Sequence, residues 1–258
     1  MAKGVRIVRE RIAHIDPVAG KALGRQGHSY RFDKVVLSPG IRVRKAAIDG
    51  YDDEAARLMP HGWDGGDGTA ALESRIESMA DGGTVLLAMT TGAARFPEGL
   101  YRRATEIAAY LRRFKPRSKV LILDGTEGGA NSARYRKHWR DRFPAGMVEW
   151  IPASQGGAVT AIGAPGRELI GPAGRFTGDV VSLIPPQEAG ALAHICGVAD
   201  RGGWCPTDPI TAQSLLAPGV FVAGDAADVT GEGRDGETAV RQGRRAAWSI
   251  LSERGGSV

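Results

Sequence analysis

Short apolar runs separate longer, more polar stretches along most of the chain. Each run is rich in valine, leucine or isoleucine and is bounded by glycine, proline or aspartate, which is typical of a strand buried on both faces of a sheet. The runs lie at residues 35–37, 84–89, 118–124, 179–184 and 219–223. Because segments of helical length lie between several of these strands, the pattern predicts an α/β fold.

Three segments have apolar positions at the spacing of a helix. From Pro97 onward, apolar residues recur on one stripe, and proline is favoured in the first turn of a helix. Residues 237–253 predict a second amphipathic helix, and residues 71–83 predict a shorter one that ends at glycine. Residues 4–37 predict a meander of short strands, whereas the pattern in residues 126–178 is less regular.

Composition narrows the class of protein. Of 258 residues, 42% are apolar, which suits a globular protein of one large domain or two smaller ones. No apolar run reaches the roughly 18 residues that a membrane span needs, and the N-terminus has no signal-peptide pattern. The net charge of +5 suggests an anionic partner, but the basic residues occur in pairs on predicted helices and only 6% of residues are aromatic. We therefore expect no nucleic-acid binding.

A carboxylate follows the last of the buried strands. Gly224 and Asp225 come directly after residues 219–223, and ligands bind at the carboxyl ends of strands in α/β sheets. Asp225 is therefore a candidate ligand-binding residue. The alternative is that Asp225 only caps the following turn, a position that aspartate favours.

Residues 83–124 have the strand–helix–strand order of a nucleotide-binding unit. The first turn of that unit reads AMTTGAARFPEG and lacks the G-x-G-x-x-G pattern that lets the backbone approach a pyrophosphate. We therefore expect the unit to pack a core rather than to bind a nucleotide, which disfavours an NAD-linked reductase. Asp124 stands where a ribose-binding acid would, but aspartate is also common at strand ends before turns.

Several long segments, in order along the chain, resemble one known family. They read KVVLSPGI, YDDEAARLMPHGW, MADGGTVLLA, RFPEGLYRRATEIAAYLRRFKPRSKVLILD, VVSLIPPQEAG, GGWCPTD and GVFVAGDAAD. These segments resemble the flavoprotein subunit of flavocytochrome c sulfide dehydrogenase. That subunit belongs to the FAD-dependent pyridine nucleotide-disulfide oxidoreductase superfamily, together with sulfide:quinone oxidoreductase. Because the matches are collinear over nearly the whole chain, the resemblance is specific.

The resemblance implies an α/β, FAD/NAD(P)-binding-like architecture with two lobes. Residues 1–45 and 176–258 would form a remnant of the FAD-binding domain, residues 46–69 a linker, and residues 70–175 a central Rossmann-like, NAD-binding-like domain. We expect the chain to lack the N-terminal segment that cradles the FAD pyrophosphate and also the family's C-terminal domain. The flavin domain would then be truncated, so we expect this chain alone to bind FAD weakly or not at all.

The resemblance also assigns roles to single residues. It implies that Pro39, Gly40, Gly224, Asp225 and Ala226 bind FAD. Among them Asp225 resembles the acid that accepts hydrogen bonds in the ribityl or pyrophosphate region of the flavin.

Two redox cysteines lie beside the flavin in this family. Cys205 matches one of them, whereas Phe96 stands where the family has the other. Cys205 is the candidate catalytic residue, and it is either a thiolate that attacks sulfur or a packed residue without chemistry. Cys196 can replace the missing partner only if its Cα comes within about 7 Å of that of Cys205, and its apolar neighbours favour simple packing. Replacing Phe96 by cysteine should restore a disulfide to Cys205 if the family geometry holds.

Two classes of function follow from the resemblance. The first is an FAD-dependent oxidoreductase of the sulfide dehydrogenase type, which oxidises a small sulfur compound and passes electrons to a cytochrome c subunit, together with a separate N-terminal flavin-binding chain. The second is a non-catalytic relative or fragment that serves as a binding or assembly module. The family is commonly periplasmic. The two cysteines do not have the spacing of a metal site, so we expect no metal.

Overall fold

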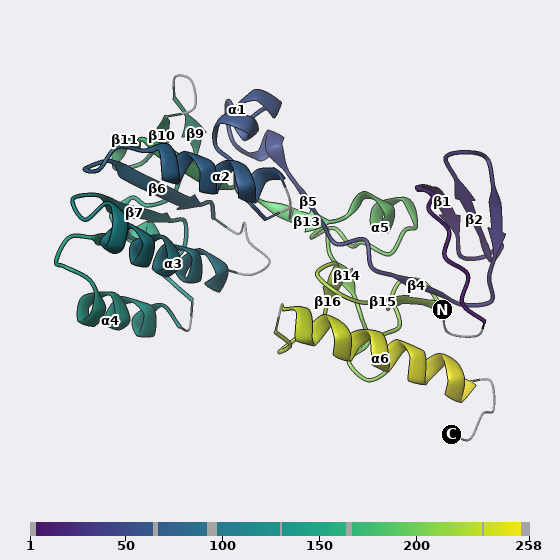
Figure 1. The fold of residues 1–258 in the computed structure, drawn as a ribbon. Coiled ribbons are helices and arrows are strands. Elements are labelled where there is room, and N and C mark those ends of the chain that lie inside the picture. Colours follow the sequence, from purple (N-terminus) through teal and green to yellow (C-terminus); the bar gives the residue numbers. More distant parts are fainter. Residues whose placement is uncertain are drawn as a thin grey trace. The chain divides into compact units, whose positions relative to one another are not determined.

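The computed structural model describes residues 4–63, 67–91, 97–129, 131–163, 167–233 and 235–253 (Figure 1). The chain forms two compact units. Unit 1 combines residues 1–42 with residues 188–258, and unit 2 comprises residues 43–187. The chain passes from one unit to the other at strands β5 (Ile41–Val43) and β13 (Gln187–Ala189), which pair with each other.

A four-stranded parallel sheet forms the centre of unit 2. Its strands are, in spatial order, β12 (Val180–Ile184), β6 (Thr84–Met89), β7 (Lys119–Asp124) and β8 (Val148–Ile151). All of β12 and nearly all of β6 are buried, as expected of apolar runs that are covered on both faces. Successive side chains of β6 point to opposite faces, so Val85 and Leu87 join one core and Leu86 joins the other.

Three helices cover one face of this sheet (Figure 1). They are α2 (Asp67–Ser78), α3 (Glu98–Phe114) and α4 (Ser132–Arg142). α3 buries the stripe that the sequence predicts, from Leu100 to Leu111, and Pro97 precedes its first turn. α4 is far more polar, and its buried residues are Ser132 and Trp139.

The opposite face packs against α1 (Asp53–Leu58) and a three-stranded antiparallel sheet of β9 (Ala161–Ile162), β10 (Glu168–Gly171) and β11 (Gly174–Thr177). α1 begins after Asp52, whose carboxylate accepts hydrogen bonds from the N–H groups of Glu54 and Ala55 at 2.9 and 2.8 Å. Two 3₁₀ turns lie at Lys45–Ala47 and Ala153–Gln155. The region expected as a linker, residues 46–69, therefore contains regular structure.

Unit 1 is built from small sheets. They are the antiparallel meander of β1 (Ile12–Asp16), β2 (Lys21–Gly24) and β3 (Ser29–Arg31), the parallel pair β4 (Val35–Leu37) and β15 (Val220–Val222), and the parallel pair β14 (Cys205–Pro206) and β16 (Ala227–Asp228). Its helices are α5 (Ala191–Ile195) and α6 (Gly236–Glu253). The meander expected in residues 4–37 is confirmed for β1–β3, whereas β4 belongs to a different sheet.

The expected domain of residues 1–45 and 176–258 implies that the strands at residues 179–184 and 219–223 lie in one sheet with residues 35–37. The two expected neighbours have opposite outcomes. Val36 and Val222 lie in one sheet, as predicted, because β4 pairs with β15. The strand at residues 180–184, expected beside residues 35–37, instead pairs with β6 in unit 2. That expectation is wrong because the strand–helix–strand unit leaves one edge of β6 open, and the fully buried β12 pairs with that edge. Unit 2 consequently extends to Gln187 rather than ending near residue 175.

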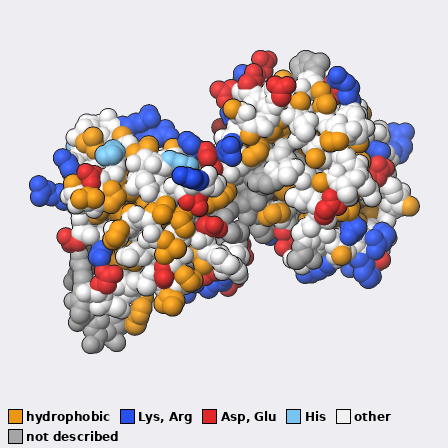
Figure 2. Space-filling model, turned by 180° about the vertical axis from the view of Figure 1, so that it is seen from behind, with side chains coloured by type: hydrophobic (Ala, Val, Ile, Leu, Met, Phe, Trp, Pro, Cys, Tyr) orange, Lys and Arg blue, Asp and Glu red, His pale blue; other side chains and the backbone are white. Residues whose placement is uncertain are grey.

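Large hydrophobic side chains are exposed on unit 1 (Figure 2). Val240, Trp248 and Leu251 lie on one face of α6, because they follow one another at helical spacing. Val36 of β4 is exposed as well, and all four residues have between 45% and 60% of their surface exposed. An apolar surface of this kind is typical of a face that another segment covers.

Candidate functional site

Two turns meet at the carboxyl ends of β4 and β15. Because the strands are parallel, Pro39 and Gly40 after β4 and Gly224 and Asp225 after β15 leave the same edge of the sheet. The N–H of Ala223 donates to the carbonyl of Leu37 at 3.0 Å, which extends the pairing to this edge. The structure thus brings together residues that lie far apart in the sequence and that the resemblance assigns to one site.

Both turns need glycine for conformational reasons. Gly40 has φ +65° and Gly224 has φ +82°, values in the left-handed region that other residues rarely adopt. The Gly224 turn closes with a hydrogen bond of 3.0 Å from the N–H of Ala227 to the carbonyl of Gly224. Asp225 follows in this turn at the surface of unit 1.

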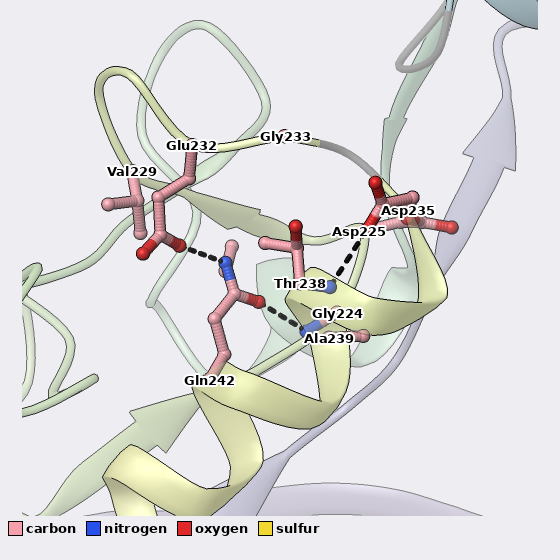
Figure 3. A pocket seen from close by; sticks show the side chains of 10 residues that line it. Gly224, Asp225, Val229, Glu232, Gly233, Asp235, Thr238, Ala239 and Gln242 are labelled. Carbon is pink, nitrogen blue, oxygen red and sulfur yellow. Dashed lines mark hydrogen bonds between the residues drawn. The ribbon is translucent and has the colours of Figure 1, made fainter.

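A small pocket lies between this turn and the first turns of α6 (Figure 3), and its free volume of about 10 Å³ is no more than a single water molecule needs. Its lining includes three acidic side chains, those of Asp225, Glu232 and Asp235. Partial burial of Asp225 raises the pKa of its carboxyl group above the usual range. The pocket is therefore rich in hydrogen-bond acceptors and poor in positive charge.

Gln242 of α6 holds the pocket together (Figure 3). Its side chain is buried; its Oε1 accepts a hydrogen bond from the N–H of Gly224 at 2.9 Å, and its Nε2 donates to Glu232 at 2.9 Å. Arg245 also donates to Glu232, at 2.5 Å. Burial opposes ionisation of Glu232, but the hydrogen bonds from Gln242 and Arg245 outweigh it and lower its pKa.

The N-terminus of α6 already has an anionic cap. Asp235 accepts a hydrogen bond of 2.8 Å from the N–H of Thr238 to its carboxylate, and its carbonyl accepts one of 3.0 Å from the N–H of Ala239. The bonds from Thr238 lower the pKa of Asp235. A phosphate at this helix end would have to displace that carboxylate.

Cys205 lies beside the same turn. Its N–H donates to the carbonyl of Ala226 at 3.0 Å, and Cys205 pairs with Ala227 in the β14–β16 ladder. The candidate catalytic residue and the candidate cofactor-binding residue Ala226 are therefore backbone neighbours. Gly190 packs on the other turn: its N–H donates to the carbonyl of Gly40 at 2.8 Å, and a Cβ there would lie 2.3 Å from the carbonyl oxygen of Pro39.

The thiol of Cys205 is completely buried. Burial, together with the nearby Asp200, Cys196 and Asp228, raises its pKa to about 12, so at neutral pH it is a neutral thiol. Cys196 ends α5 in the same hydrophobic core; burial raises its pKa too, and both cysteines are free. The packing expected for Cys196 is present. Phe96, the position of the second redox cysteine in the family, lies outside the described residues.

Asp124 at the end of β7 is an internal hydrogen-bond acceptor. It is fully buried; Oδ1 accepts from the N–H and hydroxyl of Thr126 at 2.9 and 2.7 Å, and Oδ2 accepts from Trp150 at 3.0 Å and from the hydroxyl of Tyr101. Since both oxygens are engaged, this carboxyl group is part of the core of unit 2 rather than a ribose acceptor.

Asp235 and Gln242 were not identified from the sequence, although their side chains hold the Gly224 turn and the start of α6 in place. Asp235 had a detectable signal, since an aspartate just before a helix with threonine three residues later is typical of an N-cap. Gln242 had none, because a glutamine within a predicted helix is ordinarily a surface residue. Within the described residues there is neither a metal-binding cluster of histidine, cysteine and acidic side chains nor a helix long and apolar enough to cross a membrane.

Residues 69–185 match the family model of the central region of the sulfide dehydrogenase flavoprotein chain of flavocytochrome c. This match confirms the resemblance found in the sequence and lies within unit 2.

Solved structures share the fold of nearly the whole chain. The sulfide:quinone oxidoreductase from the hyperthermophilic bacterium Aquifex aeolicus has a TM-score of 0.67 at 13% identity, and the alignment covers 96% of this chain and 61% of that protein. For a NAD-dependent persulfide reductase from A. fulgidus the TM-score is 0.69 at 15% identity, with 98% and 45% covered. For the thioredoxin reductase of T. acidophilum it is 0.61 at 17% identity, with 96% and 73% covered.

At these identities the likeness establishes the fold, and it confirms the predicted FAD/NAD(P)-binding-like α/β class. The chain spans about three fifths of the length of the sulfide:quinone oxidoreductase that it resembles.

Proposed function

We propose, from the match of residues 69–185 to the sulfide dehydrogenase flavoprotein chain, that this chain is part of a flavin-dependent oxidoreductase of that type. A further flavin-binding segment would complete its FAD site. One observation carries the proposal: the turns at Pro39–Gly40 and Gly224–Asp225 meet at one sheet edge, beside Cys205. A substrate site at such an edge is the general rule for open α/β sheets.

The residues present fit one part of FAD and not another. The carboxylate of Asp225 can accept hydrogen bonds, which suits the donating hydroxyl groups of a ribityl chain. The pyrophosphate does not fit, because Asp235 caps the N-terminus of α6 and the acidic lining repels phosphate. Pro39, Gly40, Gly224, Asp225 and Ala226 would hold the flavin end of the cofactor, which supplies the redox chemistry when bound.

The thiol chemistry of the family is weakened in this chain. A thiol–disulfide relay needs one thiolate to attack and a second thiol to resolve the product. Cys205 is buried and has a pKa of about 12, and phenylalanine stands at position 96. We therefore expect no sulfide-dependent electron transfer to a cytochrome c, the partner that the family implies, even when FAD is supplied.

A specific observation favours the alternative, a binding or assembly module. The exposed apolar face of Val36, Val240, Trp248 and Leu251 offers a docking surface to a partner chain. In this alternative the chain is a structural subunit of a complex, and the partner chain carries out the redox chemistry.

The test is a titration of the purified chain with FAD, followed by flavin absorption and fluorescence. We expect no stoichiometric complex with the chain alone and a complex after addition of a strand–turn–helix segment that carries G-x-G-x-x-G. In that complex Asp225→Asn should weaken binding about tenfold or more, the effect of losing a hydrogen bond to a charged group.

Glu237→Gln serves as the matched control, because Glu237 is an exposed acid at the start of α6 that does not line the pocket. Tight FAD in the isolated chain would show that no further segment is needed. Equal affinities of the Asp225→Asn variant and the unmodified chain would show that Asp225 does not hold the cofactor.

A further inference from the structure

Unit 2 contains a second, larger pocket between α4 and β8, which the proposed flavin chemistry does not use. This half-open pocket has a free volume of about 430 Å³. Its walls include Arg136 and Arg140 of α4, Pro144 of the connecting turn, Val148 and Trp150 of β8, and Gln155. This volume is within the range of roughly 300–1,000 Å³ that is usual for sites of small organic ligands. An inorganic ion alone would leave most of it to water.

Arg136 has a buried donor without an acceptor. Its guanidinium carbon lies 4.5 Å from the centre of the Trp150 ring, and the indole N–H of Trp150 donates to Asp124 at 3.0 Å, which fixes the ring. The Nε of Arg136 is buried, and no acceptor in the described part of the chain lies within hydrogen-bond distance of it. Arg136 and Trp150 both line the pocket, so the guanidinium group is held at the pocket wall, where it is positioned to receive an anion.

Arg140 adds a second positive charge on the same face of α4. It follows Arg136 by four residues, so the two side chains are neighbours along the helix, and like charges at this spacing destabilise a helix. In the described ranges neither arginine has an ion-pair partner, whereas Lys137 on the same helix pairs with Asp141.

The helix dipole explains only part of this arrangement. Cations near the carboxyl end of a helix are stabilising, and that effect accounts for Arg140 and Arg142 in the last turn of α4. It does not account for Arg136, which lies in the middle of the helix with its Nε buried. A bound anion would neutralise the repulsion between the two guanidinium groups, which both line the pocket.

We propose that this pocket binds a small organic phosphate. Its phosphate group accepts hydrogen bonds from Arg136 and Arg140, whose two charges match a phosphate dianion. Its organic part packs against Pro144 and Val148, which supply the apolar wall of the pocket. The amide of Gln155, at the rim, donates to or accepts from polar groups of the ligand.

Isothermal titration of the full chain with AMP at low salt tests this proposal, with inorganic phosphate and adenosine as comparison ligands. We expect one AMP to bind per chain, at least tenfold tighter than inorganic phosphate. Adenosine should show no detectable binding, and the affinity for AMP should fall as the salt concentration rises. Arg136→Gln and Arg140→Gln should each weaken AMP binding at least tenfold. Arg134→Gln is the matched control, since Arg134 is an exposed arginine of α4 that does not line the pocket.

Three results would overturn the proposal. AMP affinity that is unchanged in both pocket variants would place binding elsewhere on the chain. An equal loss in the Arg134→Gln variant would mean that the general positive field of α4 attracts AMP. If inorganic phosphate binds as tightly as AMP, the organic part of the ligand contributes nothing to binding and the proposed ligand class is wrong. Arg140 is exposed, so the Arg140→Gln variant should fold even if the Arg136→Gln variant does not.

Discussion

The thiol of Cys205 should be almost unreactive in the folded chain. Replacing Cys196 by alanine leaves Cys205 as the single cysteine of the sequence and makes its reactivity directly measurable. Its pKa rises from 9.0 to about 12 chiefly because its side chain is buried in the core of unit 1. Since only the thiolate attacks a disulfide reagent, labelling depends on the ionised fraction.

The size of the effect follows from that shift. At pH 8 a thiol with a pKa near 9 is ionised to roughly one part in ten, and one with a pKa near 12 to roughly one part in 10⁴. Ionisation alone therefore slows labelling about a thousandfold, and burial slows it further. The same shift corresponds to about 4 kcal/mol of difference between the neutral and charged forms.

The assay is labelling of the Cys196→Ala variant with 5,5′-dithiobis(2-nitrobenzoate) at pH 8, in buffer and in concentrated urea. We expect labelling in buffer to be at least a thousandfold slower than in urea. The Cys205→Ala variant, which retains only Cys196, is the matched comparison. Labelling of Cys205 in buffer within a few-fold of the rate in urea would refute the argument and would restore this thiol as an attacking group.

The raised pKa also sets the direction of a pH effect on stability. A group whose pKa is higher in the folded chain stabilises the fold fully below its unfolded pKa, and the contribution is lost as pH rises through the folded value. For Cys205 that window runs from about pH 9 to about pH 12. Against the unmodified chain, the Cys205→Ala variant should lose less stability over this window, which urea unfolding at several pH values measures.

Four further substitutions test the packing of the two units by urea unfolding. Asp124→Ala removes the acceptor of buried donors from Tyr101, Thr126 and Trp150, and it should cost roughly 2–4 kcal/mol; a cost below 1 kcal/mol would contradict the buried network. Gly224→Ala should cost about 1–2 kcal/mol because φ is +82°, whereas Gly243→Ala, within α6, should stabilise by up to about 1 kcal/mol. Gln242→Ala should cost about 1–3 kcal/mol, since it leaves the Gly224 N–H without its acceptor and removes one of the donors to Glu232. No change would mean that water replaces the Gln242 side chain.

The strands and amphipathic helices could be predicted because the local pattern of apolar and polar residues indicates which side chains are buried. β6, β7, β12 and β15 are apolar runs, and α3 has one continuous apolar stripe. The neighbour of β12 was not predictable in this way, because a strand buried on both faces fits any open edge of a parallel sheet. Its real partner, β6, is chosen by the packing of unit 2 as a whole.

The parts that were missed lack a strong local signal. α4 has one large buried side chain, Trp139, so the helical period of apolar residues is absent. β10 and β11 are short, and the exposed Arg175 interrupts the second. Asp225 could be named as a candidate because it follows a buried strand. The burial of Cys205 depends on the pairing of β14 and β16, and strands of two residues have no recognisable sequence pattern.

Unit 2 is inserted in the sequence of unit 1, and this insertion affects the order in which the chain can fold. β4 and β15 can pair only after the whole of residues 43–187 has been synthesised between them, and closing so long a flexible loop costs about 4 kcal/mol of chain entropy. Unit 2 is continuous in sequence, and the pairing of β5 with β13 joins its two ends. Once unit 2 has folded, it acts as a short rigid link between the two halves of unit 1, and most of that entropy no longer opposes the pairing. Damage to the β6–β7 core should therefore also delay formation of the distant turn at Gly224.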